Sequence, residues 1–133
     1  VAQLTSEQQA LIGSRAHAND TDAVRLMLDL GFDPIAATSD RWEPIRWAVF
    51  HGNAALTRLL LAHRPPLNTP DRSHGGTLLG NCLYGSLHGW HRKTGDFAAT
   101  VELLLDAGER LDSTWVPIGR DDVDAVLRER LRR

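Results

Sequence analysis

The sequence contains little of what many kinds of protein site require. It has one cysteine in 133 residues, Cys82, so no disulfide can form within the chain, and we expect a reducing compartment, the cytoplasm. No apolar run approaches the roughly 18 residues of a membrane span. The net charge of −2, from 15 Lys and Arg against 17 Asp and Glu, provides no overall field that attracts nucleic acid or anionic lipid. We therefore expect neither a nucleic-acid nor a membrane partner.

Sequence motifs of catalysis are also missing. There is no Gly-rich phosphate loop after a strand and no Gly-x-Ser-x-Gly. His88 and His91 have a spacing that can place two imidazoles on one ion, and His74, Cys82 and Asp96 are near in sequence. Zinc requires three or four converging ligands, however, and no third ligand stands at a recognisable spacing. We expect no enzyme activity, no metal and no cofactor.

An internal repeat is the main feature that the sequence does contain. The segment Leu26-Met27-Leu28 returns as Leu59-Leu60-Leu61 after 33 residues, and again as Leu103-Leu104-Leu105 after a further 44. Repeats with a period of 20 to 50 residues indicate stacked architectures. The longer second interval predicts about eleven inserted residues in the third unit, which we place at 86–96.

Each of these segments has apolar residues at helical spacing, and the first and third end at a glycine. A shorter helix is predicted before the second segment, over 43–52, and before the third, over 77–85. Turn-rich runs at 38–41 and 68–72 separate the units. The unit is therefore predicted to be turn, helix, helix, turn.

This unit resembles an ankyrin repeat, whose consensus contains Thr-Pro-Leu-His-x-Ala, a glycine between the helices, and Val-x-x-Leu-Leu. The matching residues here are Glu43-Pro44-Ile45-Arg46-Trp47-Ala48, then Gly52, then Leu56-Thr57-Arg58-Leu59-Leu60-Leu61, with Gly31-Phe32-Asp33-Pro34 in the first unit. The third unit is similar to a variant repeat of bacterial ankyrin proteins. The resemblance covers residues 12 to 112 and implies an all-α solenoid of stacked helix-turn-helix units, with short hairpin-like turns and helical caps.

One domain over residues 1–133 is expected, in four parts. They are an N-terminal capping repeat at 4–35, a repeat at 36–69, a repeat at 70–113 with the inserted loop 86–96, and a C-terminal capping helix within 114–133. Residues 5–8 have the form of a capping box that opens a helix. The acidic start and arginine-rich end of the last helix complement its dipole, so we interpret the arginines as solvated.

The resemblance implies a protein–protein interaction module, because ankyrin repeats contact their partners through the hairpin tips and first helices. Cys82 aligns with the small buried alanine of that repeat and is expected to be a packed, inert thiol, while Trp47 is expected to pack in the core. The inserted loop is a further place where function is grafted onto a scaffold, unless Trp90 folds back to fill the gap between units. The candidate partner-binding residues are Ser39, Asp40, Trp42, Phe50, His51, Arg72, His74, Tyr84, His88, Trp90, His91 and Arg92.

Two other interpretations stay open. The chain could be a structural segment of a longer ankyrin array that has no ligand of its own. It could also be a His-based metal-binding protein or enzyme, if His74, Cys82, His88, His91 and Asp96 converged. We expect a monomer that binds a protein partner, whose identity the sequence does not give.

Overall fold

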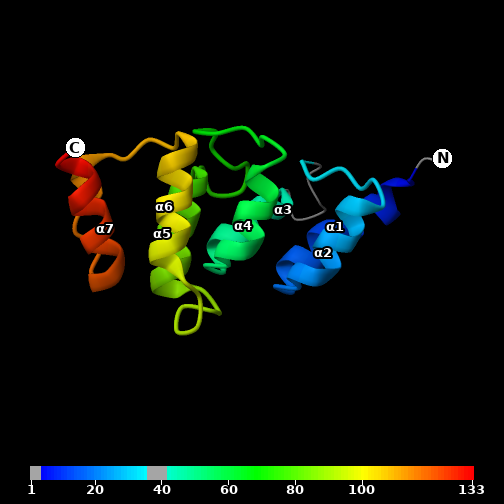
Figure 1. Cartoon of the computed structure of the whole chain (residues 1–133), viewed down its shortest axis with the longest axis horizontal. Coiled ribbons are helices and arrows are strands. Elements are labelled where there is room, and N and C mark those ends of the chain that lie inside the picture. Colours follow the sequence, from blue (N-terminus) through cyan, green and yellow to red (C-terminus); the bar gives the residue numbers. More distant parts are fainter. Residues whose placement is uncertain (1–3, 36–41) are drawn as a thin grey trace.

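The computed structural model describes residues 4–35 and 42–133, and in these ranges the regular structure is entirely helical (Figure 1). The prediction of an all-α chain is confirmed for this part. The predicted contact residues Ser39 and Asp40 lie outside it. Among the described helices, none has both the length and the apolar character needed to cross a membrane. The helices are α1 (Ser6–His17), α2 (Thr21–Asp29), α3 (Pro44–Phe50), α4 (Ala54–Leu61), α5 (Leu78–His88), α6 (Phe97–Ala107), the 3₁₀ turn η1 (Ser113–Trp115) and α7 (Asp121–Leu131).

The helices form consecutive pairs that stack in chain order. α1 packs on α2, α3 on α4 and α5 on α6. Neighbouring pairs meet through α1, α3 and α5 on one side and through α2, α4 and α6 on the other, and α7 then packs on α6. Figure 1 shows this row, with α1 and α2 at one end and α7 at the other.

The second helix of each pair begins with the same device. Asp20, Asn53 and Asp96 stand at the N-caps of α2, α4 and α6, and each side chain accepts a hydrogen bond from a backbone N–H three residues later. Such caps satisfy amides that the helix itself leaves unpaired. The repetition of this cap gives the sequence period a direct structural counterpart.

The predicted capping box at the start of α1 is confirmed. The Thr5 hydroxyl accepts from the Gln8 N–H at 3.1 Å, and the Gln8 side chain accepts from the Thr5 N–H at 2.9 Å. At the end of α6, Gly108 has φ 118°, a left-handed value that glycine adopts without strain. Helix limits are thus among the features that the sequence predicts well.

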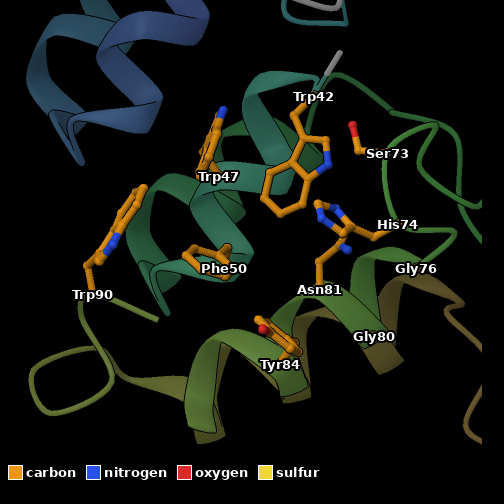
Figure 2. A pocket seen from close by; sticks show the side chains of 10 residues that line it. All are labelled: Trp42, Trp47, Phe50, Ser73, His74, Gly76, Gly80, Asn81, Tyr84 and Trp90. Carbon is orange, nitrogen blue, oxygen red and sulfur yellow. The ribbon is translucent and has the colours of Figure 1, made fainter. Parts of the chain in front are cut away.

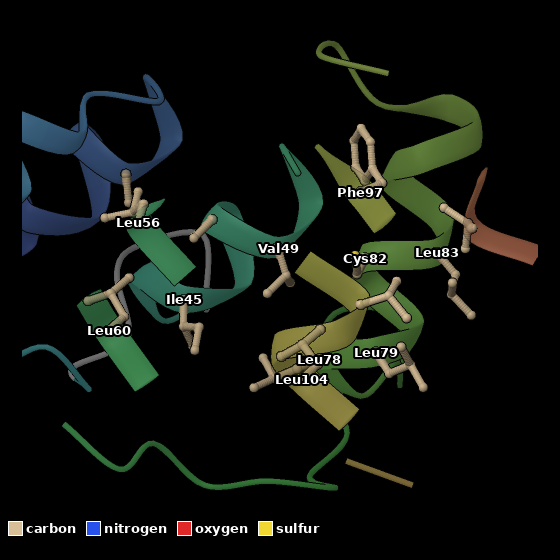
Figure 3. Close-up of a cluster of buried hydrophobic side chains, with 14 of the residues drawn as sticks. Ile45, Val49, Leu56, Leu60, Leu78, Leu79, Cys82, Leu83, Phe97 and Leu104 are labelled. Atoms are coloured by element: carbon tan, nitrogen blue, oxygen red, sulfur yellow. The ribbon is translucent and has the colours of Figure 1, made fainter. Parts of the chain in front are cut away.

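The core lies between the helix pairs and is built from aliphatic side chains and one phenylalanine (Figure 3). Leu56, Leu104 and Phe97 are fully buried. Cys82 is also fully buried on α5, and burial raises the pKa of its thiol. The prediction of a packed, inert thiol is confirmed, because a protonated thiol without solvent access is a poor nucleophile.

The inserted segment differs from the predicted loop 86–96. Its first three residues continue α5, which has 11 residues where α3 has 7, so the loop itself runs over 89–96. The Asp96 N–H donates to the Gly52 carbonyl at 2.8 Å, and Arg120 Nη1 donates to the carbonyls of Ser86 at 2.8 Å and Arg92 at 2.7 Å. The insertion is therefore held at both ends.

The C-terminal helix lies where the sequence predicts it, but one of its arginines is not simply solvated. Arg130 Nη2 contacts the carboxylates of Glu102 at 2.8 Å and Asp106 at 2.6 Å on α6. Arg128 and Arg132 are exposed, as expected for a solvated helix end. Arg130 instead joins α7 to the stack.

Candidate functional site

A pocket of about 490 Å³ opens between α3, α5, the hairpin tip before α5, and the inserted loop (Figure 2). Five of its lining side chains are Trp, Phe or Tyr, and three of these are tryptophans. We call it the aromatic pocket. It is lined by Trp42, Trp47, Phe50, Ser73, His74, Gly76, Gly80, Asn81, Tyr84 and Trp90.

α3 and Trp42, which stands two residues before the helix, supply three of the rings. Trp47 and Phe50 are three positions apart, so they lie on one side of the helix, with ring centroids 5.8 Å apart. Trp42 packs against both, at 4.6 Å from Trp47 and 5.7 Å from Phe50. Trp47 is half-buried: it packs against the core, as expected, and also lines the pocket.

Tyr84 on α5 and Trp90 on the inserted loop complete the pocket, and both are open to solvent, with 61% and 64% of their surface exposed. The Tyr84 ring lies nearly parallel to Phe50, and the Trp90 ring nearly parallel to Trp47. Trp90 also contacts the His17 ring at 5.2 Å. It covers part of the junction between units and still presents most of its surface outward.

Trp42 differs from the prediction of an exposed contact, because only 7% of its surface is accessible. Its ring is covered by α3 on one side and by the hairpin tip on the other, where it lies 6.4 Å from His74. Its side chain is also among the groups that lower the pKa of Asp71. Trp42 therefore forms a fixed wall of the pocket.

The expected role of His51 as a contact residue is wrong in this structure. The side chain is 1% exposed, and its Nε2–H donates to the His17 carbonyl at 2.7 Å. Burial lowers the pKa of His51 to about 4, despite that hydrogen bond, so the ring is neutral at neutral pH. The buried imidazole joins the end of α3 to the end of α1.

Asp71 organises the hairpin tip, although nothing in the sequence pattern singled it out. Its buried carboxylate accepts from the N–H groups of Ser73 at 2.9 Å, His74 at 2.6 Å and Gly76 at 3.0 Å. It also accepts from Asn81 Nδ2 at 3.0 Å. Burial alone would raise the pKa of Asp71, but these bonds and that of Trp42 lower it to about 2, so the carboxylate is ionised.

Arg46 connects α3 to this hairpin tip. Its side chain is 3% exposed. Its Nη1 donates to the Gly76 carbonyl at 3.0 Å and to Asn81 Oδ1 at 2.9 Å, and its Nη2 donates to the Thr69 carbonyl at 2.9 Å. Because its Nε donates to Glu43 at 2.6 Å, the charge has a partner. A guanidinium can make this many directed bonds at once.

The remaining predicted contact residues have mixed positions. Arg72 and His74 are exposed on the tip, and Arg92 is exposed on the loop. The His88 ring lies 4.8 Å from Tyr84, whereas His91 is half-buried against His51, with ring centroids 4.6 Å apart. The predicted residues that line the pocket together are Trp42, Phe50, His74, Tyr84 and Trp90.

The histidines and Cys82 of the alternative metal interpretation do not form a group. In the described ranges, no three His, Cys, Asp or Glu side chains are placed to hold one ion. The chemistry available at the pocket is therefore that of its rings and its hydrogen-bonded rim.

No protein-family model matches the chain, and no curated protein matches it. The function is accordingly argued from the geometry of the pocket.

Proposed function

We propose that this chain is a small ankyrin-type repeat module that binds a protein partner in the aromatic pocket. The observation that carries the proposal is the exposure of Trp90 and Tyr84 beside the buried rings of the same pocket. Two large exposed aromatics that line one pocket are uncommon on a surface that contacts only water. Aromatic side chains in pockets are also frequent centres of binding energy in interfaces.

The rigidity of the pocket favours binding. The hairpin tip is fixed by the bonds of Asp71, and the inserted loop is fixed through Asp96 and Arg120. Trp47 is held between His17 at 4.4 Å and Trp42 at 4.6 Å. A site that is ordered before the partner arrives loses less conformational entropy on binding.

The repeat type is supported by the structural period. The N-caps of α2 and α4 are 33 residues apart, and consecutive helix pairs stack first helix on first helix. In such stacks the hairpin tips and first helices make up the exposed binding side. The aromatic pocket lies between one tip and two first helices.

The test is affinity capture with three immobilised proteins: the wild type, a Tyr84→Ala/Trp90→Ala variant, and a Trp115→Ala control. Trp115 is also an exposed tryptophan, at 38%, but it lies in η1 and does not line the pocket. We expect a protein that is retained by the wild type and the control and lost by the pocket variant. Calorimetry with that purified protein should then show a loss of affinity of more than about tenfold in the pocket variant.

The circular dichroism spectrum of the pocket variant provides the folding control, because both replaced side chains are largely exposed. Retention of the same proteins by all three baits would contradict the proposal. So would purified partners whose affinity is unchanged in the pocket variant.

A second candidate is a segment within a longer array. Leu26 and Leu30 on and beside α2 are 59% and 64% exposed, and Leu11 on α1 is 49% exposed. The end of a repeat stack shows such apolar side chains when another unit is not packed on it. Sedimentation of the wild type and of a Leu26→Glu variant tests this idea. If the end of the stack associates through its exposed apolar side chains, the wild type should associate in a concentration-dependent way and the glutamate should abolish this association.

A further inference from the structure

We propose that the aromatic pocket binds a methylated ammonium group, carried on a lysine side chain of the partner protein. This inference rests on the proposed function and specifies the ligand chemistry of the same site. It follows from the orientation of the rings, from the charge behind them and from the kind of polar side chains in the described part of the pocket wall.

The rings face the pocket from three directions. Trp47 and Trp90 are within 12° of parallel, while Phe50 stands at 89° to Trp47 and at 78° to Trp90. Trp42 is tilted by 53° from Trp47 and by 70° from Phe50. Figure 2 shows these side chains around one opening. Parallel rings alone would suit a flat or extended ligand, whereas rings at steep angles suit a compact, rounded group.

Such an arrangement favours a cation. The face of an aromatic ring carries partial negative charge, and tryptophan attracts cations most strongly. Three of the five rings are tryptophans, and among the residues that the structure describes no Lys, Arg, Asp or Glu side chain lines the pocket. Aromatic pockets of this kind recognise quaternary ammonium groups in proteins generally.

The buried charge behind the pocket wall is negative, which favours a cation in the pocket. The Asp71 side chain is 0% exposed, and it contacts the lining residues Gly76 and Asn81. Its donors are backbone amides, the Asn81 amide and Trp42, all of which are neutral, so its negative charge is not cancelled. His74 Nδ1 lies 3.9 Å from this carboxylate and adds a positive charge only when it is protonated. The nearby guanidinium of Arg46 is paired with Glu43.

Trp42 connects this charge to the other rings. Its side chain is among the groups that lower the pKa of Asp71. Its ring packs against both Trp47 and Phe50. The buried carboxylate therefore lies behind the Trp42 side of the pocket.

Methylation is inferred from the polar groups of the wall. An unmodified lysine ammonium has three N–H donors and is strongly hydrated, so it requires acceptors to replace its water. The polar side chains of the described wall are Ser73, His74, Asn81 and Tyr84, and none of them is a carboxylate. Asn81 is already engaged by Arg46 and Asp71, and the Asp71 carboxylate is buried. A trimethylated ammonium has no N–H donor and carries its charge on methyl groups that pack on rings. Its transfer from water into this pocket therefore costs less free energy than the transfer of an unmodified ammonium.

The test compares three short peptides that differ at one side chain: trimethyllysine, its neutral isostere with carbon in place of the ammonium nitrogen, and unmodified lysine. Binding to the full chain is followed by tryptophan fluorescence and by the ring-current shift of the methyl protons. We expect trimethyllysine to bind at least tenfold more tightly than the isostere, which has the same shape without the charge. Equal affinities of these two peptides would overturn the proposal.

A fourth probe, tetramethylammonium chloride, separates a lysine on a protein from a free small cation. We expect it to bind at least tenfold more weakly than the trimethyllysine peptide, because it lacks the side-chain stem and backbone that contact the rim. Tetramethylammonium bound as tightly as the peptide would overturn the assignment to a lysine side chain.

Two variants provide a readout that folding alone would not change. Trp90→Phe should keep part of the preference for trimethyllysine over the isostere, and Trp90→Leu should remove most of it, while Trp115→Leu should leave the preference unchanged. If the isostere binds equally well and partner capture still depends on Trp90, this inference fails and the proposed protein-binding function stands. If capture does not depend on Trp90 but the trimethyllysine preference does, the proposed protein-binding function fails, and with it the assignment of the ammonium group to a partner protein, while recognition of the trimethylated ammonium by the pocket stands.

Discussion

At the scale of single residues, the site depends on buried polar groups that support the aromatic rings. Arg46 donates to Asn81 and to the Gly76 carbonyl of the following unit, and to the Thr69 carbonyl at the end of its own unit. A buried charged group stabilises such a junction only while all its partners are present. In our proposal the exposed rings contact the partner, and these buried hydrogen bonds position the rings.

Arg46→Met should therefore lower the free energy of unfolding by about 3 kcal/mol, because it leaves several buried acceptors and Glu43 without their donor. Urea denaturation followed by circular dichroism measures the loss. Arg58→Met on α4 is the matched control, since Arg58 is exposed, and a change within about 0.5 kcal/mol is expected there. Equal effects of the two substitutions would show that the junction does not depend on Arg46.

The buried His51 makes stability depend on pH. Burial lowers its pKa from 6.5 to about 4, so the folded state favours the neutral ring. The stability from this group is fully present above pH 6.5 and is lost as the pH falls toward 4, by up to about 3 kcal/mol. Denaturation at several pH values should show a smaller loss over this range in His51→Gln than in the wild type. His63→Gln, at an exposed histidine, should retain the wild-type slope, and identical slopes in all three proteins would count against this role.

At the scale of helices, the approach of α5 to α3 sets the shape of the pocket. A Cβ at Gly85 would lie 2.0 Å from the Phe50 carbonyl oxygen, so the two helices are in backbone contact there. No side chain fits at this position without moving a helix. Phe50 and Tyr84, which face each other across this contact, would move with it.

Gly85→Ala should thus lower the free energy of unfolding by about 2 kcal/mol, because overpacking at a backbone contact forces the helices apart. Gly80→Ala is the matched control on the same helix, where the nearest atom, Thr77 Oγ1, is 3.5 Å from the new Cβ. It should be neutral or raise the free energy of unfolding by up to about 1 kcal/mol through helix propensity. Thermal unfolding of both variants checks the contrast, and a tolerated alanine at position 85 would refute the close approach.

Sequence periodicity predicts where the helices lie but not how the residues of the candidate site are arranged. The caps Asp20, Asn53 and Asp96 and the leucine triplets follow local rules, so they could be predicted from spacing. The burial of Trp42 and His51 depends on contacts with neighbouring units, which no local pattern contains. The 33-residue period predicts that the insertion is a loop over 86–96. Residues 86–88 instead continue α5.

The polar network was the hardest part to predict. Asp71 lies in a turn-rich run, and turn residues with charged side chains are usually solvated. Its burial follows from the tip closing on itself, where the Asp71 N–H donates to the Gly76 carbonyl at 2.8 Å. The one available signal was Arg46 in place of the consensus histidine, since a longer and charged side chain at an inward position requires partners.

At the scale of the whole molecule, burial is uneven along the stack. α5 has seven buried residues, including Leu78 and Leu79, whereas the buried residue of α2 is Val24. In a stack of helix pairs each unit is stabilised mainly by its neighbours, so an end unit with little buried surface opens first.

Native-state hydrogen exchange should consequently show the lowest protection in α2 and the highest in α5 and α6. The physical reason is that Leu26 and Leu30 remain exposed beside α2 while α6 is covered by α5, α4 and α7. Mass spectrometry of peptic fragments from the intact chain provides the measurement. Uniform protection across all pairs would mean that the stack unfolds as one cooperative unit, contrary to this expectation.

The turns between paired helices are linked to one another along the stack. Asn53 Nδ2 donates to Asn19 Oδ1 and Thr21 Oγ1, both at 2.8 Å, and the Asp96 N–H donates to the Gly52 carbonyl. Each link joins one unit to the next, so tension applied between the two ends would load these few bonds one junction after another. Under a pulling force the molecule should therefore extend in discrete steps that each release one helix pair, and not in a single unfolding event.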